Sequence, residues 1–266
     1  MMVGMDLGLS GQRALVTAAS GGLGFATARA LAAEGARVVL CSRDEGRAHD
    51  AAARIAEETG ADVRALVADV AVAADLERLV GDAAEQLGGL DVLVNNAGGP
   101  PPGSFEALDD SHWERGFELT LMSVVRGFRH ALPHFRAAGG GSVLTLLSSS
   151  VKQPIPNLLL SNVYRPGLVG LTKSLAIDHA AEGVRVNGLA PGRISTDRTI
   201  ELNAALAKRQ GTTPEAVMEA SLKAIPMGRL GTPEEFARVA AFLVSPAASY
   251  VTGHVMIADG GSVRAL

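Results

Sequence analysis

Apolar positions along the chain follow two alternating patterns. Short runs rich in Val, Leu and Ile, such as RALVT at 13–17 and RVVLCS at 37–42, are almost continuously apolar, and longer Ala-rich amphipathic stretches separate them. The continuous runs predict strands covered on both faces, and the amphipathic stretches predict helices with one buried side. The predicted strands are 13–17, 37–42, 63–70, 90–98, 141–149, 184–192 and 254–259. The predicted helices are 21–35, 44–59, 73–88, 113–138, a long helix from about Ser161, and 233–245.

This alternation has a direct consequence for topology. Strands that alternate with helices of this length predict right-handed βαβ units and therefore a parallel sheet. No linker, low-complexity tract or long-period repeat interrupts the pattern, which favours a single domain over residues 1–266. The fold class that we expect is α/β, with one doubly wound parallel sheet of about seven strands.

Residues 195–226 break this regularity. They contain two short amphipathic helical patterns, TIELNAALAKRQG and TPEAVMEASLKAI, which Gly211 and Pro214 interrupt. A helical excursion after the carboxyl end of a strand lies where α/β proteins bind ligands, which favours a lid over the substrate. The alternative is an element that packs against the domain or forms an oligomer contact.

The composition narrows the classes of protein further. Hydrophobic residues are 47% of the chain and charged residues 20%, which allows a sizeable core and is not typical of disorder. The net charge is −4 and no basic block is present, so nucleic acid is not expected as a partner. The sequence shows no signal peptide and no 18-residue apolar run, and its single cysteine, Cys41, fits a reducing compartment. We expect a cytoplasmic protein without a membrane span or a metal site.

A glycine-rich turn follows the first predicted strand. In RALVTAASGGLGFATA this turn joins the strand to a helix, so backbone N–H groups and the helix dipole favour a bound pyrophosphate. The second strand ends in Ser42 followed by Arg43, where folds that bind NAD carry an acidic residue for the ribose 2′-hydroxyl. A hydroxyl and a guanidinium suit a 2′-phosphate, which predicts NADP as the cofactor, with NADPH preferred over NADH. The alternative for Arg43 is a solvated surface charge.

Several motifs occur in the order in which the short-chain dehydrogenase/reductase family carries them, and the chain resembles that family over essentially its whole length. The family's TGxxxGxG reads TAASGGLG at 17–24, with Ala18 in place of the first glycine, which strains the turn if the φ angle there is positive. NNAG at 95–98, the ADV that contains Asp69, and APGRISTD at 190–197 also match. The resemblance implies a Rossmann-type fold with a short helical lid and a homotetramer or homodimer. The residues expected to bind the cofactor are Thr17, Ser20, Gly22, Leu23, Gly24, Ser42, Arg43, Asp69, Val70, Asn95, Ala97, Gly98, Arg165, Pro191, Gly192, Ile194 and Thr196.

The family's catalytic residues are Asn, Ser, Tyr and Lys, with Tyr and Lys in a YxxxK pattern on one helix face. The segment GLTKSLA at 170–176 fixes the register, because family helices often read YxxxKxxxxGLTKxLA. This register places Arg165 at the Lys position and Ser161 at the Tyr position. The Ser position falls on Ser148 and the Asn position on Thr120, so one of the four family residues remains. An arginine can hold the nicotinamide ribose but does not relay a proton, and a serine is too weak an acid to replace an activated phenol.

Three nearby groups are candidates for the missing proton transfer, and one of them, the hydroxyls of Ser149 and Ser150, is more typical of turn and helix-entry residues. Tyr164 follows Ser161 by three residues, about one turn along the predicted helix, although its i+4 neighbour Leu168 supplies no paired cation. Lys152 lies four residues past Ser148 in a loop that is expected to border the substrate. The alternatives are packing or a subunit contact for Tyr164 and an ordinary exposed lysine for Lys152.

The sequence favours an NADP(H)-dependent short-chain oxidoreductase that interconverts a small-molecule carbonyl and an alcohol, similar to 3-oxoacyl reductases, with a non-standard catalytic site. Its catalytic candidates are Ser148, Ser161, Tyr164 and Arg165. The alternative is a protein of this fold that binds nucleotide without redox activity, or an isomerase or lyase. No motif identifies the substrate or the direction of the reaction.

Overall fold

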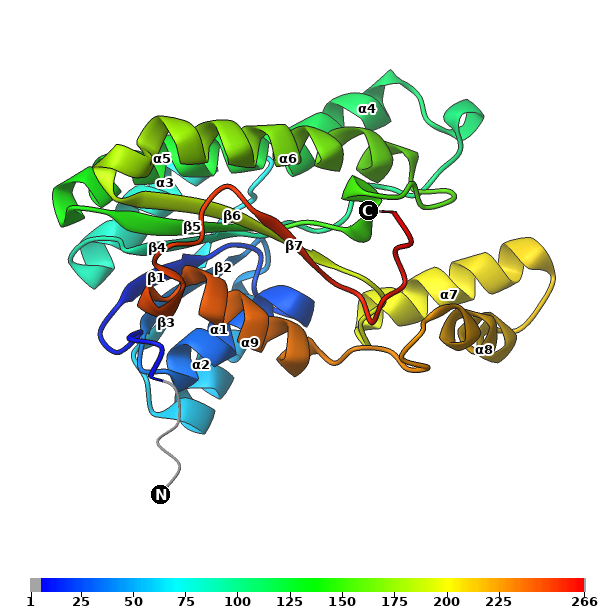
Figure 1. Cartoon of the computed structure of the whole chain (residues 1–266), viewed down its shortest axis with the longest axis horizontal. Helices are drawn as coiled ribbons and strands as arrows, with labels where there is room; N and C mark the ends of the chain where they lie inside the picture. The colour runs from blue at the N-terminus through cyan, green and yellow to red at the C-terminus, as the bar shows by residue number, and fades with distance from the viewer. Residues whose placement is uncertain (1–5, 266) are drawn as a thin grey trace.

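The computed structural model describes residues 6–265, which form one seven-stranded sheet with helices on both faces (Figure 1). All paired strands are parallel, in the order β3-β2-β1-β4-β5-β6-β7. The direction of winding reverses between β1 and β4, which confirms the predicted doubly wound α/β fold. The strands are β1 (Arg13–Val16), β2 (Arg37–Ser42), β3 (Val63–Val67), β4 (Val92–Asn95), β5 (Gly141–Leu146), β6 (Val184–Pro191) and β7 (Val255–Ala258).

Two sets of three helices cover the two faces of the sheet, and three further helices lie toward the carboxyl ends of the strands (Figure 1). The first set is α1 (Gly22–Ala33), α2 (Glu45–Thr59) and α9 (Pro233–Val244). The second set is α3 (Ala73–Leu87), α5 (Ser123–Ala138) and α6 (Leu159–His179). The further helices are α4 (Asp110–Phe117), α7 (Asp197–Gln210) and α8 (Pro214–Ala224). Within the described range, no helix combines the length and the apolarity that crossing a membrane requires.

Side chains of the central strands alternate between two hydrophobic cores. In β1, Leu15 packs into the core on the side of α3 and α5, whereas Ala14 and Val16 pack into the core on the side of α1 and α9. The next strand repeats this alternation, with Val39 on the α3 side. Because both faces are buried, these strands are continuously apolar in sequence, and this is the signal that predicted them.

The elements differ from the predicted ones mainly at the carboxyl edge of the sheet. β3, β4 and β5 each end three residues earlier than predicted, because the polar residues that follow leave the sheet to form loops. The predicted helix at 113–138 is divided into α4, a π-helical turn at Glu118–Met122, and α5. Such turns locally widen a helix and are frequent at functional sites. α6 begins at Leu159, two residues before the predicted start, so Ser161 lies in its first turn.

The range 195–226 contains α7 and α8, which project beyond the carboxyl end of β6 (Figure 1). α7 ends at Gly211, whose φ of 64° lies in the left-handed region that glycine favours. The Thr213 side chain then caps α8 by accepting the N–H of Ala216 (3.2 Å), with Pro214 in the first turn. The glycine and the proline thus separate two helices, as their positions in the sequence indicated.

Candidate active site

The carboxyl ends of β1 and β4 form the crevice where doubly wound sheets bind ligands, because the chain crosses to opposite sides of the sheet at this point. Thr17, at the end of β1, donates its hydroxyl to the Asn96 carbonyl oxygen (2.6 Å) and accepts the Asn96 N–H (2.8 Å). These bonds hold the loop after β4 against the turn after β1. The predicted cofactor residues other than Arg165 end or follow the strands at this edge: Thr17, Ser20, Gly22, Leu23 and Gly24 at β1; Ser42 and Arg43 at β2; Asp69 and Val70 at β3; Asn95, Ala97 and Gly98 at β4; Pro191, Gly192, Ile194 and Thr196 at β6.

Residues 17–24, which we call the nucleotide turn, present backbone donors at the start of α1. Gly21 is the N-cap and makes no side-chain cap, so the first N–H groups of the helix are left to a ligand or to solvent. Gly22 has a φ of 56°, in the left-handed region. A Cβ on Gly24 would lie 2.5 Å from Asn96 Nδ2, which is too close for any side chain. The backbone of the nucleotide turn therefore fits a pyrophosphate.

Ala18 takes the place of a family glycine and has a conformation that favours glycine. Its φ is 48°, in the left-handed region, where a Cβ crowds the backbone at a cost of about 1–2 kcal/mol. Its carbonyl oxygen accepts Asn96 Nδ2 (2.9 Å), and its N–H donates to Cys41 Sγ (3.3 Å). Burial raises the pKa of the Cys41 thiol to about 11, so this acceptor stays a neutral thiol at neutral pH. The alanine strains the turn, and these two bonds hold it in place.

Hydroxyl and guanidinium groups gather at the end of β2. Ser20 Oγ donates to Ser42 Oγ (3.1 Å). The side chain of Arg43 is 66% exposed, and its Nη1 lies 3.9 Å from Asp69 Oδ2. An exposed guanidinium beside two hydroxyls suits a phosphate ligand, because arginine binds phosphate oxygens in a forked geometry.

Arg47 supplies a second guanidinium near the end of β2, and it was not among the predicted cofactor residues. It lies in the first turn of α2, where Asp44 caps the helix by accepting the Arg47 N–H (2.8 Å). One of its terminal nitrogens is 3.6 Å from the position that a Cβ on Gly21 would have, so its side chain lies over the nucleotide turn. Arg47 could have been identified from the sequence, because a helix with its N-cap at Asp44 places Arg47 in the first turn, four residues after Arg43.

Ser150, Ser161 and Arg165 form a buried group, here called the Ser–Arg cluster. Arg165 Nε donates to Ser161 Oγ (3.1 Å), which lies 3.3 Å from Ser150 Oγ. Arg165 Nη1 donates to the Leu146 carbonyl oxygen (3.1 Å) at the end of β5. The spacing of four residues brings Ser161 and Arg165 together on one face of α6. Ser150 was not among the predicted site residues, although it follows Ser148 by only two residues.

Ser148 and Tyr164 lie outside the Ser–Arg cluster. Ser148 Oγ accepts the N–H of Ser150 (3.2 Å) at the start of a short 3₁₀ turn. The Tyr164 hydroxyl donates to the Trp113 carbonyl oxygen (2.9 Å), and its ring centre is 6.0 Å from those of Trp113 and Phe117. Burial raises the pKa of this phenol above its ordinary value. Tyr164 therefore packs between α6 and α4, and a backbone carbonyl oxygen accepts the hydrogen bond of its hydroxyl.

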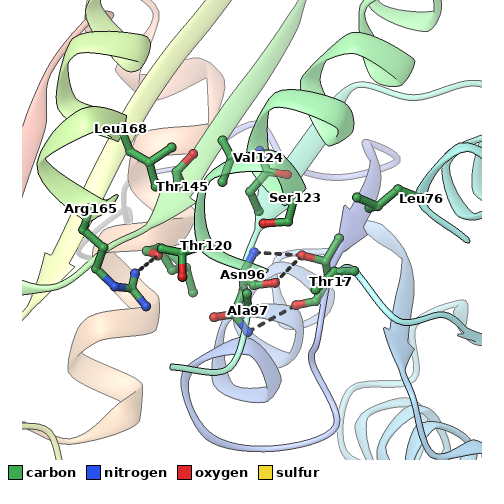
Figure 2. A pocket seen from close by; sticks show the side chains of 13 residues that line it. Thr17, Leu76, Asn96, Ala97, Thr120, Ser123, Val124, Thr145, Arg165 and Leu168 are labelled. Atoms are coloured by element: carbon green, nitrogen blue, oxygen red, sulfur yellow. Dashed lines mark hydrogen bonds between the residues drawn. The ribbon is translucent and has the colours of Figure 1, made fainter. Parts of the chain in front are cut away.

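A cavity of about 10 Å³ with a mixed polar and apolar lining has Arg165 in its wall, and it has room for one water molecule or one oxygen atom. Figure 2 shows Arg165 extending from α6 and Thr120 from the π-helical turn, next to Asn96 and Ala97 of the loop after β4. Asn95 Nδ2 and Thr120 Oγ1 are buried here and have no hydrogen-bond partner among residues 6–265. The cavity thus holds a buried amide and a buried hydroxyl that can still bind an oxygen.

The charge of Arg165 is buried without a counter-charge. The residue is 9% exposed, and no carboxylate in the described part of the chain pairs with it. Burial lowers the pKa of its guanidinium to about 10, which still leaves it positively charged at neutral pH. The cluster therefore offers a fixed cation and two hydroxyl groups, none of which titrates near pH 7.

Two features border the mouth of the site. Arg198, in the first turn of α7, reaches back to the loop after β4, where its Nη2 lies 3.4 Å from the position of a Cβ on Gly99. A second cavity, of about 310 Å³, lies between segment 103–105 and segment 154–159. Its lining includes the apolar side chains of Phe105, Ile155 and Leu159, which are of the kind that lines ligand pockets.

A parallel sheet with a glycine turn at its switch point defines a nucleotide-binding α/β protein. A family model described as enoyl-(acyl carrier protein) reductase matches residues 17–262. Dehydrogenase/reductase SDR family member 4 of Homo sapiens is 37% identical over 255 residues, which cover 96% of this chain and 88% of that protein. The chain belongs to the short-chain dehydrogenase/reductase family.

Solved structures of similar proteins agree with this assignment. L-Sorbose reductase from Gluconobacter frateurii, complexed with NADPH and L-sorbose, has a TM-score of 0.93 and 34% identity, covering 98% of this chain and 100% of that one. A 7α-hydroxysteroid dehydrogenase, complexed with NADH and 7-oxo glycochenodeoxycholic acid, has a TM-score of 0.87 and 32% identity, covering 100% of each chain. The relatives are thus dehydrogenases and reductases that act on small molecules, and the chain is a short-chain oxidoreductase.

Proposed function

We propose that this protein binds NADPH in preference to NADH and interconverts a small-molecule carbonyl compound and its alcohol, as 3-oxoacyl reductases do. The observation that carries the cofactor preference is at the end of β2. The hydroxyls of Ser20 and Ser42 and the guanidinium groups of Arg43 and Arg47 gather there, and the strand does not end in a carboxylate. A ribose 2′-phosphate would meet these four groups, whereas a ribose 2′-hydroxyl would lack its usual acidic partner. Similar structures hold NADPH or NADH, so the preference rests on this chain's own residues.

The other residues of the edge have binding roles in this proposal. A bound nicotinamide supplies or accepts the hydride. The nucleotide turn would bind the pyrophosphate through backbone N–H groups, and Ile194 and Thr196 would hold the nicotinamide amide. We assign α7 and α8 to a lid, because Arg198 connects the first turn of α7 to the loop at Gly99.

The catalytic assignment follows from which side chains remain available. Ser148 polarises the substrate oxygen, and Arg165 contributes a fixed positive charge. The Ser161 hydroxyl is engaged within the Ser–Arg cluster, and the Tyr164 phenol donates to Trp113, so we assign the proton to water. A positioned general acid is typically worth about 10²–10⁴ in rate, so carbonyl reduction is expected to be slower than in family members that carry the phenol.

Calorimetric titration of the purified protein with NADPH and with NADH tests the cofactor assignment. We expect NADPH to bind more tightly. Arg47→Ala should lower NADPH affinity by about 10- to 100-fold and leave NADH affinity unchanged, because a charged hydrogen bond contributes about 1.5–3 kcal/mol. Arg54→Ala is the matched control, since it removes an exposed arginine seven residues further along α2. Tighter binding of NADH, or binding of neither cofactor, would contradict the proposal.

A further inference from the structure

Arg165 and Arg185 are both largely buried, but their surroundings are very different. Arg185, on β6, donates to five backbone carbonyl oxygens at the end of α9 and in the loop that follows. These carbonyls lie at the negative end of a helix and satisfy the cation, as expected for an arginine with a structural role. Among residues 6–265, Arg165 has only two acceptors, both uncharged: the Ser161 hydroxyl and the Leu146 carbonyl oxygen. A buried cation with so few partners is costly, so a ligand that brings negative charge stabilises it.

The hydroxyls beside Arg165 can stabilise negative charge but are poorly placed to neutralise it. Ser161 Oγ accepts the Arg165 Nε–H, which leaves the Ser161 proton to Ser150. Ser150 Oγ is also 3.5 Å from the Ser161 carbonyl oxygen. Serine hydroxyls do not titrate near neutral pH, and an arginine does not relay protons. An oxygen that binds here therefore keeps its charge.

The cavity beside Arg165 has the size and lining of a site for one oxygen atom. Its volume is about 10 Å³, and Asn95 and Thr120, each 4% exposed, contribute the buried Nδ2 and Oγ1 atoms that lack partners. Both atoms can donate a hydrogen bond, and leaving buried donors of this kind unpaired is unfavourable. An oxygen in this cavity would satisfy both donors next to the guanidinium.

We propose that Arg165, Asn95 and Thr120 form an oxyanion site, which binds the oxygen of a compound with delocalised negative charge, such as an enolate or a phenolate. An alkoxide is a strong base and needs a proton at once, whereas a delocalised oxyanion persists next to a fixed cation. The proposal goes beyond the proposed function: hydride addition to a carbonyl carbon gives an alkoxide, so the oxyanion held at this site belongs to a bound ligand that already carries delocalised negative charge.

Binding of 4-nitrophenol tests this site without turnover, because its phenol titrates near neutral pH and its phenolate absorbs visible light. The purified full-length protein is titrated with it over a range of pH, alone and with NADP⁺. We expect the protein to bind the phenolate at least about tenfold more tightly than the phenol, which lowers the apparent pKa of the bound probe. Binding of neither form, or equal binding of both, would overturn the proposal.

Substitutions test whether the preference for phenolate over phenol comes from the proposed residues. Arg165→Met should abolish it, and Thr120→Val, which keeps the side-chain shape and the charge, should weaken phenolate binding by about 3- to 10-fold. Lys173→Met is the control, because it removes an exposed cation from the same helix and should leave the preference intact. Circular dichroism shows whether each variant is folded. If Arg165→Met does not fold, Thr120→Val still tests the site. An unchanged preference in folded Arg165→Met or in Thr120→Val would contradict the site.

NADPH titration of the same samples separates this inference from the proposed function. Tight NADPH binding without phenolate binding would overturn the oxyanion site and leave the cofactor assignment standing. Phenolate binding without NADPH binding would support the site and contradict the proposed cofactor.

Discussion

The nucleotide turn and the catalytic region occupy the same edge of the sheet but differ in how they accommodate substitutions. In the nucleotide turn, Ala18 replaces a family glycine, and the turn keeps a pyrophosphate-compatible shape because two hydrogen bonds fix its backbone. In the catalytic region, the register predicted from GLTKSLA places Thr120, Ser161 and Arg165 at three family positions, and on this prediction the functional groups themselves change. A site built from backbone N–H groups tolerates a new side chain at the cost of strain. A site built from a phenol with a lowered pKa loses that chemistry when the phenol is replaced.

The arginines of the two regions differ in the same way. Around the nucleotide turn, Arg43 is exposed and lies 3.9 Å from a carboxylate, so it is free to exchange its partners for a phosphate. In the catalytic region, Arg165 is buried with uncharged acceptors and stays fixed. On the predicted register, the position that holds a lysine in the family therefore keeps a cation here, and the neighbouring position carries a serine in place of the proton donor.

Introducing the family's Tyr and Lys at positions 161 and 165 should have the largest effect on activity. The double variant Ser161→Tyr/Arg165→Lys returns a phenol beside a lysine on one helix face, and we expect carbonyl reduction to rise by about 10²–10⁴, the usual worth of a general acid. Oxidation of NADPH with a panel of ketones and aldehydes measures it. Ser161→Phe/Arg165→Lys supplies the same ring without its hydroxyl, so equal rates in the two variants would show that the missing phenol is not what limits turnover.

A smaller effect tests the strain in the nucleotide turn. Ala18→Gly should raise the free energy of unfolding by about 1 kcal/mol, because the φ of 48° suits glycine better than alanine. Urea denaturation measures the change. Ala19→Gly, at the neighbouring buried alanine, should lower stability instead, because it removes a buried methyl group without relieving a strained φ. A loss of stability in Ala18→Gly would mean that the turn is not strained.

The smallest effect distinguishes packing from catalysis at Tyr164. Tyr164→Phe removes the hydroxyl that donates to Trp113, so the free energy of unfolding should fall by about 0.5–1 kcal/mol. The turnover number should not change, because this hydroxyl faces α4. Chemical denaturation and steady-state kinetics on the same preparation measure both quantities. A large fall in turnover number with little loss of stability would restore Tyr164 as a proton donor.

The sheet and the position of the glycine turn at its edge were predictable because their signals are local. Two-sided burial makes strands such as β1 and β2 continuously apolar, and the glycines of the nucleotide turn come directly after the first strand. The φ of Ala18 was not predictable, since it depends on Asn96 and on Cys41, which lie in other loops and strands. The direction of Tyr164 depends on α4, which a π-helical turn separates from α5. The contact between Ser150 and Ser161 of α6 depends on the 3₁₀ turn after β5, which the sequence pattern did not predict.

The central claim is that redox function persists without the family's phenol, and deuterium transfer tests it most directly. NADPH labelled at C4 of the nicotinamide, in each of the two stereochemical positions, is incubated with the protein and a broad panel of carbonyl compounds, and the products are analysed by mass spectrometry. We predict that at least one alcohol product carries deuterium from one of the two labelled cofactors. Tight binding of NADPH without deuterium in any product would contradict the claim and favour a nucleotide-binding or non-redox use of the fold.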